Sequence, residues 1–457
     1  MIVNNFSDLL FIFRFMPVFF IIYIMAPPKR RSLVLCLGSL VFYAFGDFRF
    51  LAVLLAAVII NYAAGKFTFE ENRIMLIIIA ALDAGMLMTF KILSQYVNSS
   101  LLPLGISFFT FKMISYQADL YMGKFRKQPS LLRTATYFVM FPQIISGPIM
   151  RYDPKVKNKL WLTRKRDKSF GRRVADGLSA LEDGLSYFIA GLAMKVLVAD
   201  RFAMFWNEIG RIGYDSLSTP LAWLGAAGYS MNLYFDFWGY SLMAGGLGVA
   251  LGYPFITNFD QPYAADSVRD FYRRWHATLG AWFRDYVYIP LGGSRCGEAA
   301  VIRNLFVVWL LTGIWHGITF NFILWGMLLF AIICWERFLA ERFPGLFKVL
   351  GRLHVYILIP LTWVIFAIND FRRLGQYFSR LFPFFGGSGI EGDFVRILGT
   401  YKFLFLIGFL LMIPQLYQLF LKYRKNKIVT VLLLILFWYC VSVSANSAGN
   451  PFMYFKF

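Results

Sequence analysis

One histidine, His316, stands within an apolar stretch of eighteen residues, 309–326, that contains no charged side chain. A continuous helix of that length would be about 27 Å long, which is most of the thickness of a bilayer core. An ionisable side chain at such depth is costly to bury and is read as functional by default. Because a neutral imidazole accepts protons near neutral pH, His316 is a candidate general base. The alternative is a histidine that packs between helices and bonds to a carbonyl group.

A second histidine, His276, follows a tryptophan as His316 does. If residues 270–288 form one helix, His276 faces aromatic and leucine side chains, whereas Asp270 and Arg274 are spaced to pair on another side. The pattern predicts an interfacial helix that directs one histidine inward. This arrangement fits a site residue and a hydrogen-bonded core histidine equally well.

The third histidine, His354, lies beside Arg352 in a stretch that resembles a loop, and we expect a solvated side chain there. His276 and His316 are forty residues apart, and no carboxylate or thiolate stands at ligand spacing near either, so we predict no metal site. The GxSxG motif of serine hydrolases, the HExxH motif of zinc proteases and the P-loop are all absent from the sequence.

The composition is that of a protein embedded in a membrane. Of 457 residues, 59% are hydrophobic and 16% are charged, whereas about a quarter of the residues of a soluble domain are charged. We predict an all-α polytopic fold, in a single domain over residues 1–457, with about ten transmembrane helices. The expected spans lie near residues 9–26, 33–46, 50–64, 74–92, 103–122, 178–199, 220–235, 355–368, 403–421 and 429–445. The short apolar pieces between 237 and 325 cannot be assigned as spans.

Basic loops predict the orientation and account for the net charge of +21. Residues 27–32, 151–173 and 422–427 should be cytoplasmic, with both chain termini outside. Residues 134–150 have basic segments on both sides and contain two prolines and a glycine, so we predict a re-entrant element there that does not cross. The partners expected of these loops are membrane lipids and not nucleic acid, since no basic soluble domain is present.

The segment GLGVALG, residues 246–252, is only superficially similar to a nucleotide-binding glycine motif, because no strand precedes it. Gly248 and Gly252 have the spacing of small residues at a helix–helix contact, and we predict helix packing there.

Several motifs together resemble those of the membrane-bound O-acyltransferase superfamily, in its bacterial alginate O-acetyltransferase branch. They are LVFYAFGDFRF, LPLGISFFTFKMISYQADLY, FPQIISGPIMRY, YFDFWGYSLMAGGLGVALGY, DFYRRWHATLGAWFRDYVYIPLGGSR, LTGIWHGITFNFILWG and the terminal NPFMYFKF. These stretches cover nearly the whole chain in the family's order. The resemblance implies a fold in which transmembrane, re-entrant and interfacial helices surround a central tunnel.

The resemblance also implies a reaction. An acyl thioester enters from the cytoplasm, an acceptor hydroxyl approaches from the other side, and the two meet in the tunnel. His316 would take the hydroxyl proton during attack on the thioester, and His276 would orient or stabilise the reactants at the cytoplasmic mouth. The candidate substrate-binding residues are Trp315, Asn321, Asp236, Trp275, Arg273 and Arg284.

The same branch implies an acetyl group, with acetyl-CoA as donor substrate and no bound cofactor. The acceptor would be an extracytoplasmic polysaccharide or cell-wall polymer, reached with the help of an extracytoplasmic esterase-like partner, and the expected location is the bacterial cytoplasmic membrane. The basic loops would attract the polyanionic coenzyme A, although anionic lipids would use them equally well.

Two alternatives remain open at this point. One is the transfer of D-alanine or another acyl group from a carrier protein to teichoic acid. The other is a proton-coupled transporter in which the histidines relay protons. Transporters often contain internal repeats, and none is found between the two halves of this chain. Asp83 is the one acidic residue deep within a clear predicted span.

Overall fold

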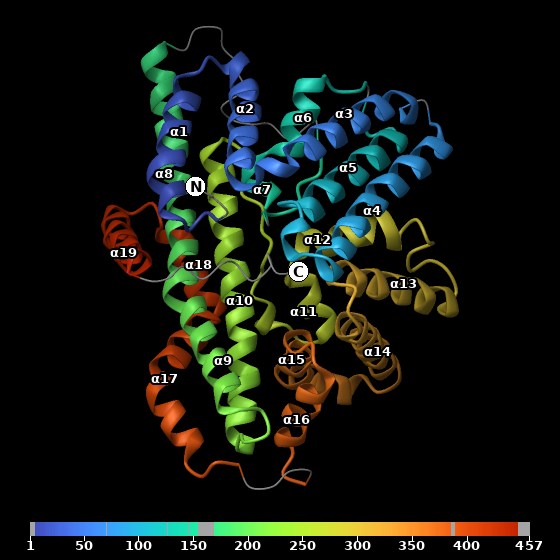
Figure 1. Cartoon of the computed structure of the whole chain (residues 1–457), viewed down its shortest axis with the longest axis vertical. Helices are drawn as coiled ribbons and strands as arrows, with labels where there is room; N and C mark the ends of the chain where they lie inside the picture. Colours follow the sequence, from blue (N-terminus) through green and yellow to red (C-terminus); the bar gives the residue numbers. More distant parts are fainter. Residues whose placement is uncertain are drawn as a thin grey trace. The chain divides into compact units, whose positions relative to one another are not determined.

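The structure is a computed structural model that describes residues 5–69, 71–125, 127–145, 147–153, 169–384 and 389–446. Within these ranges the chain is predominantly helical and contains no strand (Figure 1). The prediction of an all-α fold is therefore confirmed. Most of the basic loop at 151–173 lies outside the described residues, as does the terminal NPFMYFKF motif.

The first part of the chain forms helices that extend to Ala193. Their bounds are α1 (Met16–Met25), α2 (Pro28–Asp47), α3 (Leu51–Thr68), α4 (Arg73–Tyr96), α5 (Ile106–Tyr121), α6 (Leu131–Val139), α7 (Phe141–Ile144) and α8 (Phe170–Ala193). A π-helical turn, Phe11–Phe15, precedes α1. Local signals fix several ends. The side chain of Asn72, for example, accepts a hydrogen bond from the backbone N–H of Met75 and caps α4.

The second part of the chain begins with another π-helical turn, Met194–Ala199. The helices that follow are α9 (Asp200–Ile212), α10 (Thr219–Ala250), α11 (Val268–Arg274), α12 (Ala277–Phe283), α13 (Glu298–His316), α14 (Phe320–Arg342), α15 (Pro344–Ala367), α16 (Phe371–Leu381), α17 (Asp393–Leu411), α18 (Pro414–Tyr423) and α19 (Lys427–Ala445). Prolines open α15 and α18, where the missing N–H has no helical partner to lose.

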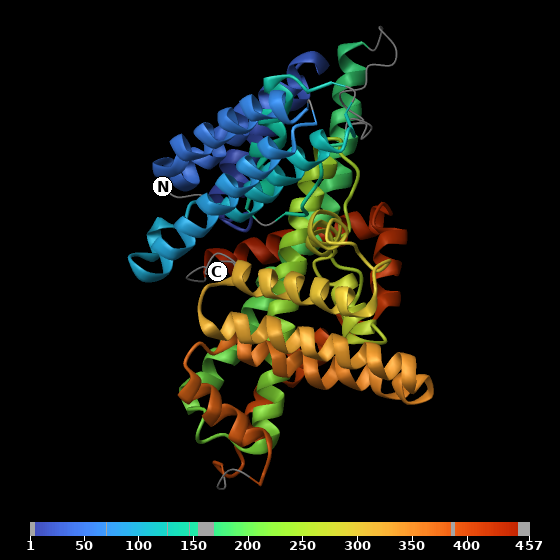
Figure 2. The same ribbon diagram turned by 90° about the vertical axis from the view of Figure 1, so that its right-hand side faces the viewer.

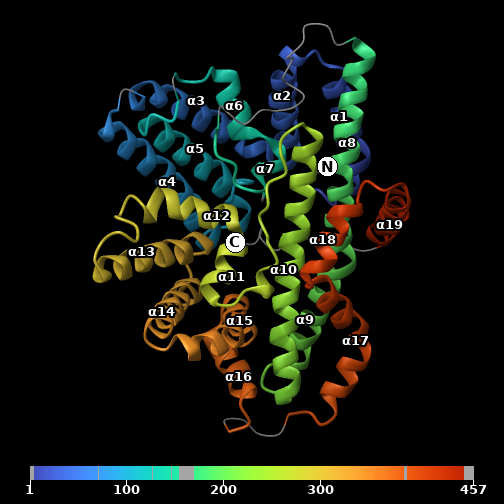
Figure 3. The same ribbon diagram turned by 180° about the vertical axis from the view of Figure 1, so that it is seen from behind.

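The helices group into two compact units. Among the described residues, the first unit consists of those within Met1–Leu192, Tyr240–Thr257 and Thr430–Pro451, and the second of those within Ala193–Gly239 and Asn258–Val429. Within the first unit, α3, α4 and α5 lie side by side (Figure 3). Within the second, α14 packs between α13 and α15 (Figure 2). The single domain over residues 1–457 stays a prediction.

Seven helical stretches among the described residues are long and apolar enough to cross a membrane. They are Pro28–Thr68, Arg73–Tyr96, Glu298–His316, Phe320–Arg342, Pro344–Ala367, Asp393–Leu411 and Lys427–Ala445. The chain is therefore a multi-pass membrane protein, as predicted. Helices α13 and α14, which the sequence left unassigned, belong to this set. The predicted span at 9–26 falls on the shorter apolar helix Phe11–Met25. The spans predicted at 103–122, 178–199 and 220–235 fall in α5, in α8 with the π-helical turn after it, and in α10. None of these four belongs to the set, and the total of about ten stays a prediction.

Polar side chains are buried within these helices. In α5, the Nζ atom of Lys112 donates a hydrogen bond to the carbonyl oxygen of Tyr137, at 2.5 Å. Asp83 in α4 accepts a hydrogen bond from the Asn61 side chain, and Gln117 donates to Asn61 in turn. Such contacts let polar groups lie among apolar helices, because each unsatisfied group would be costly there. The polar residues also lower the mean hydropathy of the helices that contain them, and membrane spans are recognised by that hydropathy.

Residues 134–150 do not form a membrane-length helix. They contain the C-terminal part of α6 and the four-residue helix α7, and Pro142 stands in the first turn of α7. Nearly every described residue of this segment is buried. Helices of nine and four residues are too short to span a bilayer, in agreement with the prediction that this segment does not cross.

Helices α8 and α10 cross at glycines, within the first unit. A Cβ atom at Gly184 would lie 2.3 Å from the carbonyl oxygen of Gly246, and one at Gly246 would lie 2.5 Å from that of Gly184. The predicted packing pair, Gly248 with Gly252, is wrong. A Cβ at Gly248 would meet nothing within 4 Å, and Gly252 has a φ of +92° just after α10 ends. Two residues along a helix turn the side chain by about 200°, so Gly248 faces away from the crossing.

We predict that Gly184→Ala or Gly246→Ala destabilises the protein, because the added methyl group must push two backbones apart. Overpacking of this kind costs about 1–3 kcal/mol of unfolding free energy. Gly248→Ala is the matched control and should be neutral or stabilising, since Ala favours helices more than Gly does. Thermal denaturation of the purified proteins in detergent measures the difference. Equal melting temperatures for the variants would contradict the crossing at Gly184 and Gly246.

Candidate active site

The apolar stretch 309–326 is not one membrane span, as its length suggested, but the meeting of two helices. Helix α13 ends at His316, Gly317 is extended, and α14 starts at Phe320. The two helices approach closely at glycine: a Cβ at Gly313 would lie 2.7 Å from the carbonyl oxygen of Phe322. An apolar run does not distinguish one span from two abutting helix ends, which is why the sequence left this segment unassigned. His316 therefore lies at the end of a helix.

Aromatic rings surround His316, which is 5% exposed. Its ring centroid lies 4.4 Å from that of Trp315, 5.0 Å from Trp325 and 5.1 Å from Phe366. A Cβ at Gly317 would lie 2.3 Å from the ring of Phe322. Glycine at 317 therefore makes room for an aromatic ring of the protein.

His276 lies in a break between two short helices, so the predicted continuous helix over 270–288 is wrong. Helix α11 ends at Arg274, α12 begins at Ala277, and His276 has a φ of +44° and a ψ of +48°. Few residues other than glycine adopt this left-handed conformation. The break turns the imidazole inward, where it packs edge-on against Phe237 with ring centroids 4.6 Å apart.

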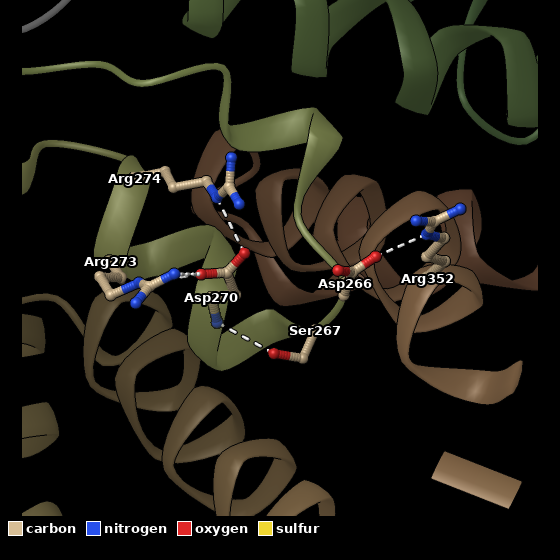
Figure 4. A network of polar contacts seen from close by, with 6 residues as sticks. All are labelled: Asp266, Ser267, Asp270, Arg273, Arg274 and Arg352. Atoms are coloured by element: carbon tan, nitrogen blue, oxygen red, sulfur yellow. Dashed lines mark hydrogen bonds and ion pairs between the residues drawn. The ribbon is translucent and has the colours of Figure 1, made fainter. Parts of the chain in front are cut away.

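Three charged residues of α11, namely Asp270, Arg273 and Arg274, form a network of ion pairs (Figure 4). Asp270 pairs with Arg274 at 2.8 Å, as its spacing predicted, and also with Arg273 at 2.5 Å. The backbone N–H of Asp270 donates to the side chain of Ser267, which caps the helix. Arg273 is 77% exposed in its side chain. Both ion pairs join residues of one helix, so they stabilise α11 itself.

One cavity of about 390 Å³ connects the two histidines, within the second unit. His276 and His316 both line it, and Trp315 lies between them with its ring centroid 6.3 Å from that of His276. Three arginines contribute to the same lining, namely Arg269, Arg284 and Arg337. The cavity therefore combines two imidazoles, aromatic walls and positive charge, which suits acid–base chemistry on an anionic substrate.

The predicted site residues divide into two groups. His316, His276, Trp275 and Arg284 line the cavity, whereas Trp315, Asn321, Asp236 and Arg273 are not among its lining residues. Asn321 lies in the first turn of α14 and stabilises it. Its side-chain oxygen accepts a hydrogen bond from the Thr319 hydroxyl, and its side-chain N–H donates one to Asn369 at 2.8 Å. The sequence analysis did not select Arg269 and Arg337, which also line the cavity. Each stands next to an acidic residue, Asp270 or Glu336, and nothing else in the sequence marks them.

Asp236 lies on α10 in a buried ion pair. Its carboxylate is 2.9 Å from the Nζ atom of Lys195, and Lys195 also contacts Asp200 at 2.6 Å. Lys195 belongs to the π-helical turn 194–199, an irregularity that is frequent at functional sites. The neighbouring residue on α10, Phe237, contacts His276. The ion pair therefore fixes the helix that supports His276.

His354 is not a solvated loop residue, as the sequence suggested. It lies within α15, its side chain is 13% exposed, and its Nδ1 atom is 3.2 Å from the carboxylate of Glu336. Glu336 is buried on α14 and also accepts the backbone N–H groups of Val268 and Arg269, at 2.8 and 3.0 Å. The sequence did not indicate this contact, because Glu336 lies in a largely apolar segment. Its buried carboxylate is bonded to the start of α11 and lies beside His354 on α15.

This chain is similar to a known protein family and to several known proteins. The family model of MBOAT, the membrane-bound O-acyltransferase family, matches residues 91–348, which include the whole cavity. The "Probable alginate O-acetylase AlgI" of Pseudomonas fluorescens is 34% identical over 388 residues, covering 83% of this chain and 76% of that protein. The peptidoglycan O-acetyltransferase of Helicobacter pylori is 33% identical, covering 80% and 77%. The teichoic acid D-alanyltransferase of Bacillus subtilis is 30% identical, covering 49% and 56%.

We predict that Asp236→Asn lowers the unfolding free energy by about 3 kcal/mol, because removing one partner of a buried ion pair leaves an undercompensated charge. Asp200→Asn is the comparison variant. Its carboxyl side chain is 25% exposed, so its loss should cost less. Thermal denaturation of both variants in detergent gives the order. An Asp236→Asn protein as stable as the wild type, yet unable to bind substrate, would instead assign Asp236 to the substrate.

Proposed function

This chain belongs to the membrane-bound O-acyltransferase family, and we propose that it transfers an acetyl group from acetyl-CoA to a hydroxyl group of an extracytoplasmic polysaccharide or cell-wall polymer. The family predicted from the motifs is thereby confirmed, and the chain is a multi-pass O-acyltransferase. The single observation that carries the proposed reaction is the cavity that His276 and His316 line together.

The choice of acetyl over D-alanyl rests on the extent of similarity. The relatives named as an alginate O-acetylase and a peptidoglycan O-acetyltransferase match 83% and 80% of this chain. The D-alanyltransferase of Bacillus subtilis matches 49% of it. A match over nearly the full chain supports a shared reaction better than a match over half of it. Both acetylating relatives act on polymers by name, which supports a polymer as the acceptor.

The proposed chemistry requires one base. The acceptor hydroxyl oxygen attacks the carbonyl carbon of the thioester, and the imidazole of His316 takes the hydroxyl proton as the new C–O bond forms. The C–S bond then breaks, and the coenzyme A thiolate leaves with the proton that His316 returns to it. The products are the acetyl ester and the free thiol, so protons and electrons balance. His316 is neutral again at the end of the cycle.

The walls of the cavity favour this reaction over hydrolysis. Tyr272, Trp275, Trp309 and Trp325 line it together with the histidines. Apolar and aromatic walls exclude water, which would otherwise compete with the polymer hydroxyl for the thioester. In water-poor surroundings the electrostatic effect of each charged group is also stronger than in water. The narrow volume suits the acyl-carrying arm of the donor better than the whole coenzyme.

Arg269, Arg284 and Arg337 give the cavity a positive lining that suits coenzyme A. Guanidinium groups bind phosphate oxygens through two parallel hydrogen bonds, and they keep their charge at every physiological pH. In this proposal acetyl-CoA is a substrate that enters and leaves, not a bound cofactor. The cytoplasm is its source, so the arginines would mark the cytoplasmic end of the cavity.

The proposal places the protein in the bacterial inner membrane, among lipids, with donor on one side and acceptor on the other. An extracytoplasmic esterase-like partner would complete delivery to the polymer, because a polymer cannot enter a cavity of about 390 Å³ along its length. A single hydroxyl-bearing residue of the partner, or the end of a polymer chain, is small enough to enter the cavity and reach His316.

We predict that His316→Gln lowers kcat by about 10²–10⁴-fold, the usual contribution of a positioned general base. Glutamine keeps the polarity and most of the volume, so the protein should still fold and bind donor. His354→Gln is the matched control and should retain transfer, since His354 is not among the residues that line the cavity and a glutamine amide N–H can donate to Glu336 in its place. The assay is acetyl transfer by purified protein in detergent or nanodiscs. Near wild-type transfer by His316→Gln would exclude the proposed base.

We also predict that Arg337→Gln raises the KM for acetyl-CoA about tenfold, because one charge-assisted hydrogen bond to phosphate is lost. The effect should shrink at high salt, where screening weakens the remaining attraction. Arg342→Gln, on the exposed last turn of the same helix, is the control and should leave KM unchanged. An equal KM for both variants would remove the arginines from donor recognition.

A further inference from the structure

Asn258 holds the break in which His276 lies. Its backbone oxygen accepts the N–H of Ala277, at 2.9 Å. Its side-chain oxygen accepts from the backbone N–H of Thr278 at 3.3 Å and from the Thr278 hydroxyl at 2.8 Å. The same Oδ1 atom lies 3.1 Å from Nδ1 of His276. Asn258 and His276 are both buried, at 3% exposure each.

These contacts determine which way the amide of Asn258 points. A backbone N–H can only donate, so the atom that meets the N–H of Thr278 must be the oxygen and not the nitrogen. An amide turned the other way would set two donors against each other. The orientation of Asn258 therefore follows from a group whose role as donor is certain.

The amide orientation in turn fixes the proton on His276. An amide oxygen cannot donate, so the 3.1 Å contact is a hydrogen bond only if Nδ1 of His276 carries the proton. In the neutral ring the other nitrogen, Nε2, is then a bare acceptor. Nε2 is buried and has no hydrogen-bond partner among the residues that the structure describes. His276 lines the cavity, so a bound molecule is the partner that Nε2 can obtain.

We propose that Asn258 is a positioning residue that locks His276 in its Nδ1–H form, so that Nε2 accepts a hydrogen bond from an N–H or O–H group of a bound substrate. The inference rests on the proposed function for the identity of the substrates, but the tautomer does not depend on it. Two groups have the required chemistry: an amide N–H in the arm of the thioester donor, and the hydroxyl of the acceptor.

The surroundings of the ring agree with a neutral acceptor. Burial lowers the pKa of His276 to about 3, so the ring carries no second proton at any physiological pH. His276 is also held in the left-handed backbone region, at a φ of +44°. A strained conformation persists where neighbouring contacts over-determine it, and the contacts from Asn258 to Ala277, Thr278 and His276 do so here.

The direct test is solid-state ¹⁵N NMR of the full-length protein, labelled at histidine and reconstituted in lipid. The chain has three histidines, so His276→Gln and His354→Gln assign the signals. We expect His276 to show a protonated Nδ1 and an unprotonated Nε2, with no change between about pH 5 and pH 8. A protonated Nε2 at neutral pH would overturn the proposal without any reference to transfer activity.

Variants at two positions separate the tautomer from general stability. Asn258→Asp keeps an acceptor oxygen opposite Nδ1, so the Nδ1–H form should persist. Asn258→Leu removes that oxygen, and a protonated Nε2 should appear in the spectrum. Thr278→Val is the matched control: it removes a hydrogen bond to the same Oδ1 atom but leaves the backbone N–H, and the tautomer should not change. An unchanged spectrum in Asn258→Leu would exclude Asn258 as the residue that sets the tautomer.

Kinetics then identify the group that Nε2 accepts from. Loss of one hydrogen bond of ordinary strength changes binding about 3–10-fold. If the donor amide is the partner, Asn258→Leu should raise the KM for acetyl-CoA by this factor and Asn258→Asp should restore it. If the acceptor hydroxyl is the partner, the KM for the acceptor or kcat should change instead. Unchanged kinetics in Asn258→Leu, with the tautomer altered, would refute the substrate contact while leaving the role of His316 intact.

Discussion

A carboxylate buried on α14, that of Glu336, joins the part of the chain that carries His276 to the part that carries His316. It accepts the first two backbone N–H groups of α11, and it lies beside His354 on α15. Breaking such a contact is expensive, because the orphaned carboxylate would remain buried among apolar helices. Helix α11 leads to His276, and α14 follows directly on the turn after His316. The spacing of the two histidines around one cavity therefore depends on this carboxylate.

Close packing between α13 and α14 makes this part of the protein rigid. Gly313 and Gly326 let α13 and α14 approach until backbone meets backbone: a Cβ at Gly326 would lie 2.6 Å from the carbonyl oxygen of Trp309. Helices that touch through glycine have little freedom to slide, since any shift brings a side chain into the contact. The end of α13 is thus held from one side by α14, and α14 is held by Glu336. His316 is the residue at that end.

The sequence was sufficient for the family and insufficient for the backbone of the site. The pairing of Asp270 with Arg274 depends on local spacing, which a sequence displays directly. The break at His276 does not, because its left-handed conformation depends on Asn258, eighteen residues earlier in the chain. The same holds for the crossing of α8 and α10. The spacing of Gly248 and Gly252 suggested a contact, but only the partner helix decides which face of α10 meets Gly184.

The aromatic surroundings of His316 bear on how a membrane enzyme can use a base at all. A permanently charged residue in such a site would have to be paired or hydrated, and both would fill the space that substrates need. A neutral imidazole is tolerated, and in the proposed mechanism it becomes positive only while it holds the hydroxyl proton. Trp325 and Phe366 then lie within about 5 Å of its centre, a distance at which an aromatic ring attracts a cation. In that mechanism the attraction would act on the charged ring and hardly on the resting ring, so it would lower the barrier without binding the ground state more tightly.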